Sequence, residues 1–222
     1  MGPETVRRVC RALSMEYGNP RLGNKSNPLD ELVYIILSTR TQDQAFRVTF
    51  AKLKARFPSW GAVRSRDRQR IERILRPAGL SRLKTRQLLA VFGDLRSSFG
   101  RATLAPMRRL PNRQAEAFLT SLPGVAAKVA KCVLMYSLGR HVLPVDVHVH
   151  RVATRLGLRT KKRPDTSQDL IEGAIPQRLR YGFHVNAVAH GRAVCLPRVP
   201  RCEVCCIAKW CDYYRARVAK AS

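Results

Sequence analysis

Acidic residues are scarce in this chain of 222 residues, because 15 Asp and Glu stand against 42 Lys and Arg, a formal net charge of +27. Repulsion among so many cations disfavours a compact chain, so the imbalance indicates a polyanionic partner, with nucleic acid as the first candidate. Hydrophobic residues nevertheless make up 45% of the sequence. This fraction excludes a disordered basic tail and predicts a folded protein.

Long hydrophobic runs are also missing. The best candidate, residues 32–37, is far shorter than the roughly 18 apolar residues that a membrane span requires. Arg7, Arg8 and Arg11 interrupt the N-terminal segment, which excludes the apolar core of a signal peptide. We therefore expect no membrane association and a cytoplasmic protein, associated with the nucleoid if the source is bacterial.

Strand-type alternation is nearly absent, and helical periodicity takes its place along most of the chain. Asn27 followed by Pro28 predicts the N-cap and first residue of an apolar helix that reaches Leu37. Ser81 similarly predicts the N-cap of a helix that ends at Gly100. Other helices are expected near residues 6–13, 41–57, 71–75, 112–121, 127–138, 146–157, 166–175 and 181–193. The expected fold class is all-α.

A Pro-Gly turn joins two of these predicted helices, in the segment Leu122-Pro123-Gly124-Val125-Ala126-Ala127-Lys128. Such a turn presents backbone N–H groups at the start of the second helix, where a phosphate group binds favourably. A hairpin of this kind holds the DNA backbone without reading sequence. A plain helix-helix corner with a left-handed glycine explains the segment equally well.

Lys128 and Asp146 are the candidate catalytic residues. Lys128 falls in the first turn of a predicted helix, where the helix dipole and neighbouring cations are expected to lower its pKa, as an amine nucleophile requires. Asp146 reads both as the N-cap of the next helix and as a carboxylate that stabilises a cationic transition state. The alternative for Lys128 is an ordinary surface lysine, and the alternative for Asp146 is a purely structural cap. His148 and His150 lie on different helix faces, which favours packing over joint metal binding.

Cysteines are few and unevenly placed. Cys10 and Cys132 are isolated, and Cys206, which adjoins Cys205, is most simply a bystander. Four thiols with the spacing x6, x2 and x5 are enough to hold one metal centre; they are Cys195, Cys202, Cys205 and Cys211. Structural zinc usually uses two short Cys-x2-Cys knuckles, and only one is present, so the spacing favours an iron–sulfur cluster.

The hairpin with Lys128, the Val145-Asp146-x-His148 segment and the four-cysteine spacing together resemble the endonuclease III family of helix-hairpin-helix DNA glycosylases. The resemblance runs from about Asn27 to Cys211. It implies two lobes, a six-helix barrel domain at 28–141 and a helical domain formed by 1–27 and 142–222. The second domain would carry a [4Fe-4S] cluster on the four cysteines.

The resemblance also implies a function. Lys128 matches the family's nucleophilic lysine and Asp146 its essential aspartate. The implied enzyme is a monomer that acts on double-stranded DNA containing a damaged base, removes oxidised or damaged pyrimidines and cleaves the strand by β-elimination through a Schiff base, as a glycosylase and AP lyase. Base flipping would expose the lesion.

Several residues depart from the family pattern or extend it. Ala126 stands where the family hairpin has a second glycine, and Arg40 stands where a glutamine fills the gap left by the flipped base. Leu80 resembles the intercalating leucine, with an ordinary loop leucine as the alternative. Arg198 and Arg201, in the loop before Cys202, are expected to present charge to phosphates.

Two other functions remain open from the sequence. One is a non-catalytic DNA-binding module, which is consistent with the high net positive charge and with the departures from the family pattern at Ala126 and Arg40. The other is a monofunctional glycosylase for mismatched or alkylated bases. Tyr34 stands where the adenine-specific mismatch branch has a glutamate, which argues against that branch.

Overall fold

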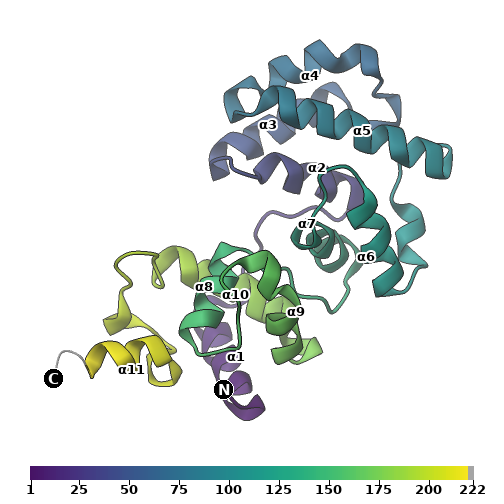
Figure 1. Cartoon of the computed structure of the whole chain (residues 1–222). Coiled ribbons are helices and arrows are strands. Elements are labelled where there is room, and N and C mark those ends of the chain that lie inside the picture. The colour runs from purple at the N-terminus through teal and green to yellow at the C-terminus, as the bar shows by residue number, and fades with distance from the viewer. Residues whose placement is uncertain (220–222) are drawn as a thin grey trace. The chain divides into compact units, whose positions relative to one another are not determined.

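The computed structural model describes residues 1–219, and helices form all the regular secondary structure in that range (Figure 1). The all-α prediction is confirmed. The chain forms two compact units, unit 1 (Met1–Gly23 with His141–Ser222) and unit 2 (Asn24–Arg140). Within residues 1–219, no helix is both long and apolar enough to cross a membrane.

Unit 2 is built around α2 (Pro28–Ser38), which contacts α3, α5, α7 and η5. All residues of α2 except Asp30 and Ser38 are buried, as expected of a helix that is apolar on every side. The other α-helices of the unit are α3 (Asp43–Arg56), α4 (Arg68–Leu75), α5 (Ser81–Phe99), α6 (Asn112–Ser121) and α7 (Ala127–Cys132). Its shorter elements are η1 (Trp60–Ala62), η2 (Ser65–Asp67), η3 (Arg76–Ala78), η4 (Ala105–Arg108) and the π-helical η5 (Val133–Ser137).

The start of α2 follows the prediction, and the start of α5 does not. Asn27 Oδ1 accepts hydrogen bonds from the backbone N–H groups of Leu29 and Asp30 at 2.9 and 3.1 Å. In contrast, Ser81 is the first residue of α5, and Leu80 occupies the N-cap position with a positive φ of 53°. The prediction of a Ser81 cap is therefore wrong, because a left-handed residue precedes the helix where a side-chain cap was expected.

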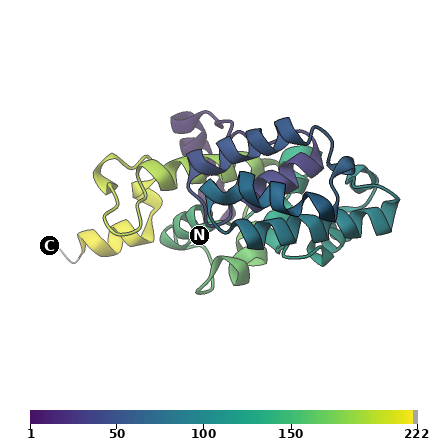
Figure 2. The same cartoon turned by 90° about the horizontal axis from the view of Figure 1, so that it is seen from above.

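Unit 1 is organised around α10 (Arg180–Ala193), which packs against α1 (Pro3–Tyr17) and α8 (Val147–Arg155). Its remaining elements are α9 (Pro164–Ala174), η6 (Gln177–Leu179), η7 (Cys202–Val204), η8 (Ala208–Trp210) and α11 (Asp212–Val218). The segment that follows α10 loops out and returns as α11, as the yellow end of the ribbon shows in Figure 2. The predicted apolar stripe of the first helix is buried in the core of this unit; its residues are Val6, Val9, Cys10 and Leu13.

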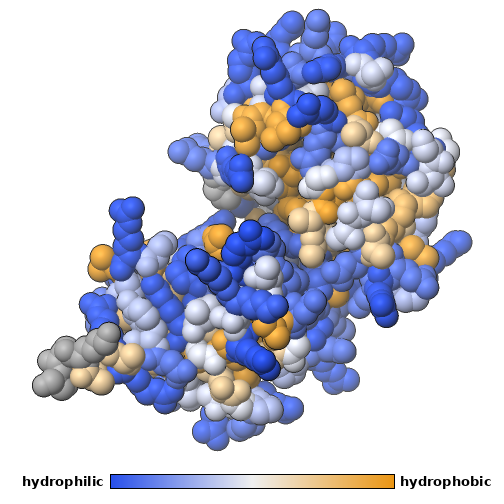
Figure 3. All heavy atoms as spheres, viewed as in Figure 1, coloured by the Kyte–Doolittle hydropathy of each residue, from blue (hydrophilic) through white to orange (hydrophobic). Residues whose placement is uncertain are grey.

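Hydrophilic residues cover most of the visible surface, which is largely blue in Figure 3. Among the described residues, four charged side chains are buried instead: Glu31, Lys84, Lys131 and Glu172. Glu172 pairs with Arg180 at 3.0 Å, and Lys131 lies 3.4 Å from a carboxylate oxygen of Glu116. Because a buried charge is costly unless it is compensated, Glu31 and Lys84 require partners of their own.

Candidate functional site

The turn between α6 and α7 has the geometry expected of the hairpin. Gly124 adopts a positive φ of 70°, and a Cβ at this position would lie 2.6 Å from Gln87 Nε2. Gln87 Nε2 also donates hydrogen bonds to the carbonyl oxygens of Pro123 and Gly124, at 3.2 and 3.0 Å. The turn is therefore held against α5 and admits only glycine at position 124 without strain.

Ala126 fits the hairpin without distortion. It is exposed and serves as the N-cap of α7 with φ −85° and ψ 166°, an extended conformation that any residue adopts. The glycine that the family has here is thus not required by the backbone of this chain. Leu122 is buried and anchors the turn to the core, Pro123 is half-buried and Gly124 is exposed.

Lys128 is the second residue of α7 and is half-buried. Its charge acts on Glu31, a fully buried carboxyl on α2, the helix that packs against α7. Burial raises the pKa of Glu31 to about 7, whereas hydrogen bonds from Lys25 and Asn24 and the charges of Lys128 and Lys25 lower it. The candidate nucleophile therefore lies in the field of a buried carboxyl group.

Sequence reasoning missed Glu31. Glu31 Oε2 accepts a hydrogen bond of 2.6 Å from the backbone N–H of Lys25, and Oε1 accepts one of 2.5 Å from Asn24 Nδ2. The available signal was an acidic residue inside a helix that is otherwise apolar on every side. A carboxylate with that placement is rarely left buried unless partners stabilise it.

Asp146 caps α8 in unit 1. Its Oδ1 accepts hydrogen bonds from the backbone N–H groups of His148 and Val149, at 2.9 and 2.8 Å. The capping alternative for Asp146 is thus realised, and both bonds use the same carboxylate oxygen. Lys128 belongs to unit 2 and Asp146 to unit 1.

The two histidines near Asp146 have packing and hydrogen-bonding roles. His148 Nδ1 lies 3.0 Å from Arg151 Nη2, and burial lowers the pKa of His148, which favours the neutral ring. His150 Nε2 lies 3.0 Å from the carbonyl oxygen of Lys161 and 3.2 Å from Ser167 Oγ. Each ring therefore has hydrogen-bonding partners of its own.

The two residues expected to enter DNA share an unusual backbone conformation in unit 2. Arg40 and Leu80 have φ values of 52° and 53°, and Asn19 is the other non-glycine residue with a positive φ in residues 1–219. Both side chains are exposed, Leu80 to 45%. A leucine in the left-handed region is a true outlier, and such outliers concentrate at functional sites.

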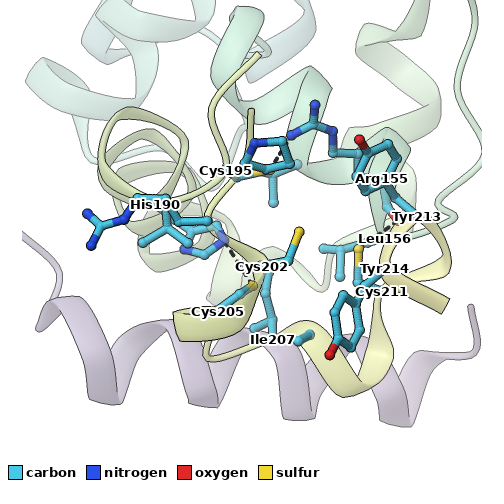
Figure 4. Close-up of a pocket in the computed structure, with 15 residues that line it drawn as sticks. Arg155, Leu156, His190, Cys195, Cys202, Cys205, Ile207, Cys211, Tyr213 and Tyr214 are labelled. Carbon is cyan, nitrogen blue, oxygen red and sulfur yellow. Dashed lines mark hydrogen bonds between the residues drawn. The ribbon is translucent and has the colours of Figure 1, made fainter. Parts of the chain in front are cut away.

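The four predicted cysteine ligands line one cavity of unit 1 (Figure 4). Cys195 follows α10, Cys202 begins η7, and Cys205 and Cys211 lie before and after η8. The segment with these two short turns after α10 therefore brings the thiols together. Cys206 does not line the cavity. Within residues 1–219, no group of three or more His, Cys, Asp or Glu side chains is placed to hold a single metal ion.

Hydrogen bonds from outside the cysteine loop reach three of these thiols. Arg155 Nη1 donates to Cys195 Sγ at 3.2 Å, and the Cys211 thiol donates to the Arg155 carbonyl oxygen at 3.2 Å. His190 Nε2 lies 3.5 Å from Cys205 Sγ (Figure 4). Contacts of this kind orient sulfur ligands and tune a bound centre.

The cavity is unfavourable for bare thiolates. Burial raises the pKa of Cys205 to about 12 and also raises the pKa of Cys211. A bound cationic centre reverses this preference, because a coordinated thiol is deprotonated. The donor set, four thiols that line one space, fits an iron–sulfur centre, whose irons are held by cysteine thiolates. Arg198 and Arg201 are both exposed on the same loop.

Comparison with known proteins gives consistent matches. Residues 33–177 match the family model for HhH-GPD superfamily base excision DNA repair proteins. Endonuclease III of Synechocystis sp. is 32% identical over 190 residues, covering 85% of this chain and 83% of that protein. Endonuclease III of Thermotoga maritima is 27% identical over 198 residues, covering 89% of each.

A solved structure has the same fold as this chain. It is a trapped covalent intermediate of endonuclease III with DNA, with a TM-score of 0.82 and 22% identity, and the match covers 98% of this chain and 99% of that one. The family model spans more than half of the chain, and the Synechocystis relative exceeds 30% identity over most of it. The chain therefore belongs to the endonuclease III family, within the HhH-GPD superfamily of base excision DNA repair proteins.

Proposed function

We propose that this protein is a DNA glycosylase with AP lyase activity that acts, as a monomer, on damaged pyrimidines in double-stranded DNA. The observation that carries the proposal is the half-buried Lys128 at the start of α7, directly after a turn held by Gln87 and a left-handed Gly124. A hairpin that only bound DNA would need neither this amine nor Asp146.

Lys128 supplies the nucleophile in this mechanism. Its neutral amine attacks C1′ of the damaged nucleotide, the bond from C1′ to the base breaks, and the base leaves with the electron pair. Opening of the sugar ring then gives a Schiff base between Lys128 and C1′. Loss of a proton from C2′ expels the 3′ phosphate, which breaks the strand. A residue with this role must lose a proton before it attacks.

Asp146 stabilises the positive charge that develops on the sugar as the base departs. Its hydrogen bonds to His148 and Val149 fix the orientation of the carboxylate, so capping and catalysis are compatible in one residue. The neutral ring of His148 adds no competing positive charge next to it. We propose that Asp146 and Lys128 serve the same sugar.

DNA contacts are assigned to the exposed parts of the site. The backbone at Pro123, Gly124 and Ala126 is proposed to hold phosphates, with Leu122 as the buried anchor of the turn. Arg40 and Leu80 are proposed to occupy the duplex where the damaged base leaves it. Arg198 and Arg201 add positive charge from the cysteine loop.

We further propose that Cys195, Cys202, Cys205 and Cys211 hold a [4Fe-4S] cluster. When bound, the cluster supplies a structural cross-link between the turns that follow α10. Arg155 and His190 are placed to donate hydrogen bonds to sulfur and so to orient the ligands. The domain roles follow, with residues 28–141 as the six-helix barrel domain and residues 1–27 and 142–222 as the cluster domain.

A panel of duplexes, each with a single lesion, tests the proposed activity. Released base and broken strand are scored separately with the purified full-length protein. We expect base release and strand cleavage together on at least one oxidised pyrimidine. Base release without cleavage would indicate a monofunctional glycosylase. Salt-sensitive duplex binding with neither product across the panel would indicate a non-catalytic DNA-binding module.

A further inference from the structure

Lys84 on α5 is a buried cation whose partners are all neutral oxygens. Lys84 is only 3% exposed. Its Nζ donates a hydrogen bond of 2.7 Å to the carbonyl oxygen of Leu37 and another to Thr41 Oγ1. Burial lowers the pKa of Lys84, because it disfavours the charged form of the side chain. A lysine in so unfavourable a place indicates a structural role for its hydrogen bonds.

The first partner of Lys84 is the end of α2. Leu37 lies in the last turn of this helix, where carbonyl groups have no partner within the helix and the dipole favours a cation. The ammonium group of Lys84 thus acts as a C-cap from another helix. It binds the last turn of α2 at Leu37, three residues before Arg40.

The second partner of Lys84, Thr41, connects it to the loop that carries Leu80. Thr41 Oγ1 accepts from Lys84 Nζ and has two carbonyl oxygens within reach of its single proton, that of Ala78 at 3.1 Å and that of Thr39 at 3.3 Å. The shorter contact, to Ala78, is the one that joins two segments. Ala78 is the last residue of η3, two residues before Leu80. One hydroxyl group therefore links the loop that carries Arg40 to the loop that carries Leu80.

Both loops are strained, which explains why they need such a link. Arg40 and Leu80 have positive φ values, and the left-handed region disfavours residues that carry a Cβ. Strained residues persist only where surrounding contacts over-determine the backbone. The hydrogen bonds of Lys84 and Thr41 provide such contacts on the inner side of both loops.

We propose that Lys84 and Thr41 are positioning residues that hold Arg40 and Leu80 as one preformed element for entry into the DNA duplex. The proposal rests on the function proposed above, in which these two exposed side chains replace the departing base. Preformed side chains lose less conformational freedom on binding than loops that must order first. Neither Lys84 nor Thr41 touches the reacting atoms.

Matched substitutions at Thr41 test this role. Thr41→Val has nearly the same shape but removes the hydroxyl, whereas Thr41→Ser keeps it. Single-turnover excision of an oxidised pyrimidine from duplex DNA should fall about tenfold in Thr41→Val and stay within about threefold of wild type in Thr41→Ser. Cleavage at a preformed abasic site, where no base must be displaced, should change less than about threefold in both.

A double-mutant cycle with Leu80→Ala identifies the route of the effect. Thr41→Val should cost less than about twofold once Leu80 is already removed. Full additivity, or equal loss at the abasic site and at the paired lesion, would overturn the positioning role. If Thr41→Val is unfolded at the assay temperature, the same comparison uses Lys84→Met, with the exposed Lys52→Met as the control for loss of one charge.

Assays of the wild-type protein distinguish a failure of the proposed function from a failure of the positioning role. If it neither excises a lesion nor cleaves an abasic site, the proposed function fails. If it does both and Thr41→Val does both equally well, the positioning role fails and the proposed function stands.

Discussion

Glu31 on α2 and Lys128 on α7 are electrostatically coupled within unit 2. Burial raises the pKa of Glu31 to about 7, and the charge of Lys128 acts in the opposite direction by lowering it. A buried acid beside the proposed nucleophile therefore titrates near neutral pH. This coupling links the stability of the unit to its chemistry.

Glu31 should make the protein less stable as the pH rises from about 4.5 to about 7. In this range the folded state binds the proton more tightly than the unfolded state, so the free energy of unfolding falls as the pH rises. The full penalty is roughly 3 kcal/mol, at about 1.4 kcal/mol for each pKa unit. Glu31→Gln should remove this pH dependence.

Denaturant unfolding of the wild type and Glu31→Gln at pH 5 and pH 8 measures the effect. The Gln amide can keep both contacts if Asn24 rotates its own amide, since Asn24 then accepts where it formerly donated. We expect the variant to gain stability relative to wild type at pH 8 but not at pH 5. An equal difference at the two pH values would show that Glu31 does not titrate in this range.

Two substitutions of Asp146 should distinguish its capping role from its proposed catalytic role. Asn is as good an N-cap as Asp, so Asp146→Asn should leave the melting temperature nearly unchanged while base excision falls by at least about a hundredfold. Asp146→Ala should lose the same activity and also about 1 kcal/mol of stability. Asp146→Asn with normal single-turnover excision would reduce Asp146 to a structural cap.

Gly124→Ala should weaken DNA binding and destabilise the hairpin. The added Cβ would meet Gln87 Nε2 at 2.6 Å, and the positive φ costs roughly 1–2 kcal/mol with any side chain. Gly93 provides the control, since a Cβ there would meet nothing within 4 Å and helix propensity favours Ala. Gly93→Ala should bind duplex DNA like wild type. Equal affinity of Gly124→Ala and Gly93→Ala in fluorescence anisotropy would remove the turn from the DNA interface.

The cysteine cavity predicts which thiols matter. Cys211→Ser should abolish the yellow-brown absorbance expected of an iron–sulfur cluster, because Cys211 lines the cavity. Cys206→Ser should retain it, since Cys206 lies outside the lining. Visible spectra and iron content, measured on anaerobically purified protein, distinguish the variants. Loss of iron in both, or a colourless zinc-containing wild type, would contradict the assignment.

Local signals in the sequence were sufficient for several features. The Asn27 cap and the burial of α2 follow from short-range chemistry, and both are present in the structure. Asp146 was readable as a cap for the same reason, since its partners lie two and three residues away. The conformation of Ala126 was left open by the sequence and is an ordinary extended one.

Features that depend on distant parts of the chain could not be read in this way. The expected Ser81 cap is wrong because Leu80 occupies the N-cap position with a positive φ. The carbonyl oxygen of Ala78 in the same loop has its partner in Thr41, 37 positions away. Lys84 was missed because its partners, Leu37 and Thr41, lie 47 and 43 positions away. Arg155 is 40 positions from Cys195 and carries no motif that would connect them. The α11 helix, seven residues long, was not expected either.

Borohydride trapping on lesion-containing DNA tests the central claim most directly. The wild-type protein should form a covalent complex with the duplex, and peptide mapping should place the reduced adduct on Lys128. Lys128→Ala should remain folded, bind the duplex and form no complex. An undiminished complex with Lys128→Ala, or an adduct mapped to another residue, would contradict the assignment of Lys128 as the nucleophile.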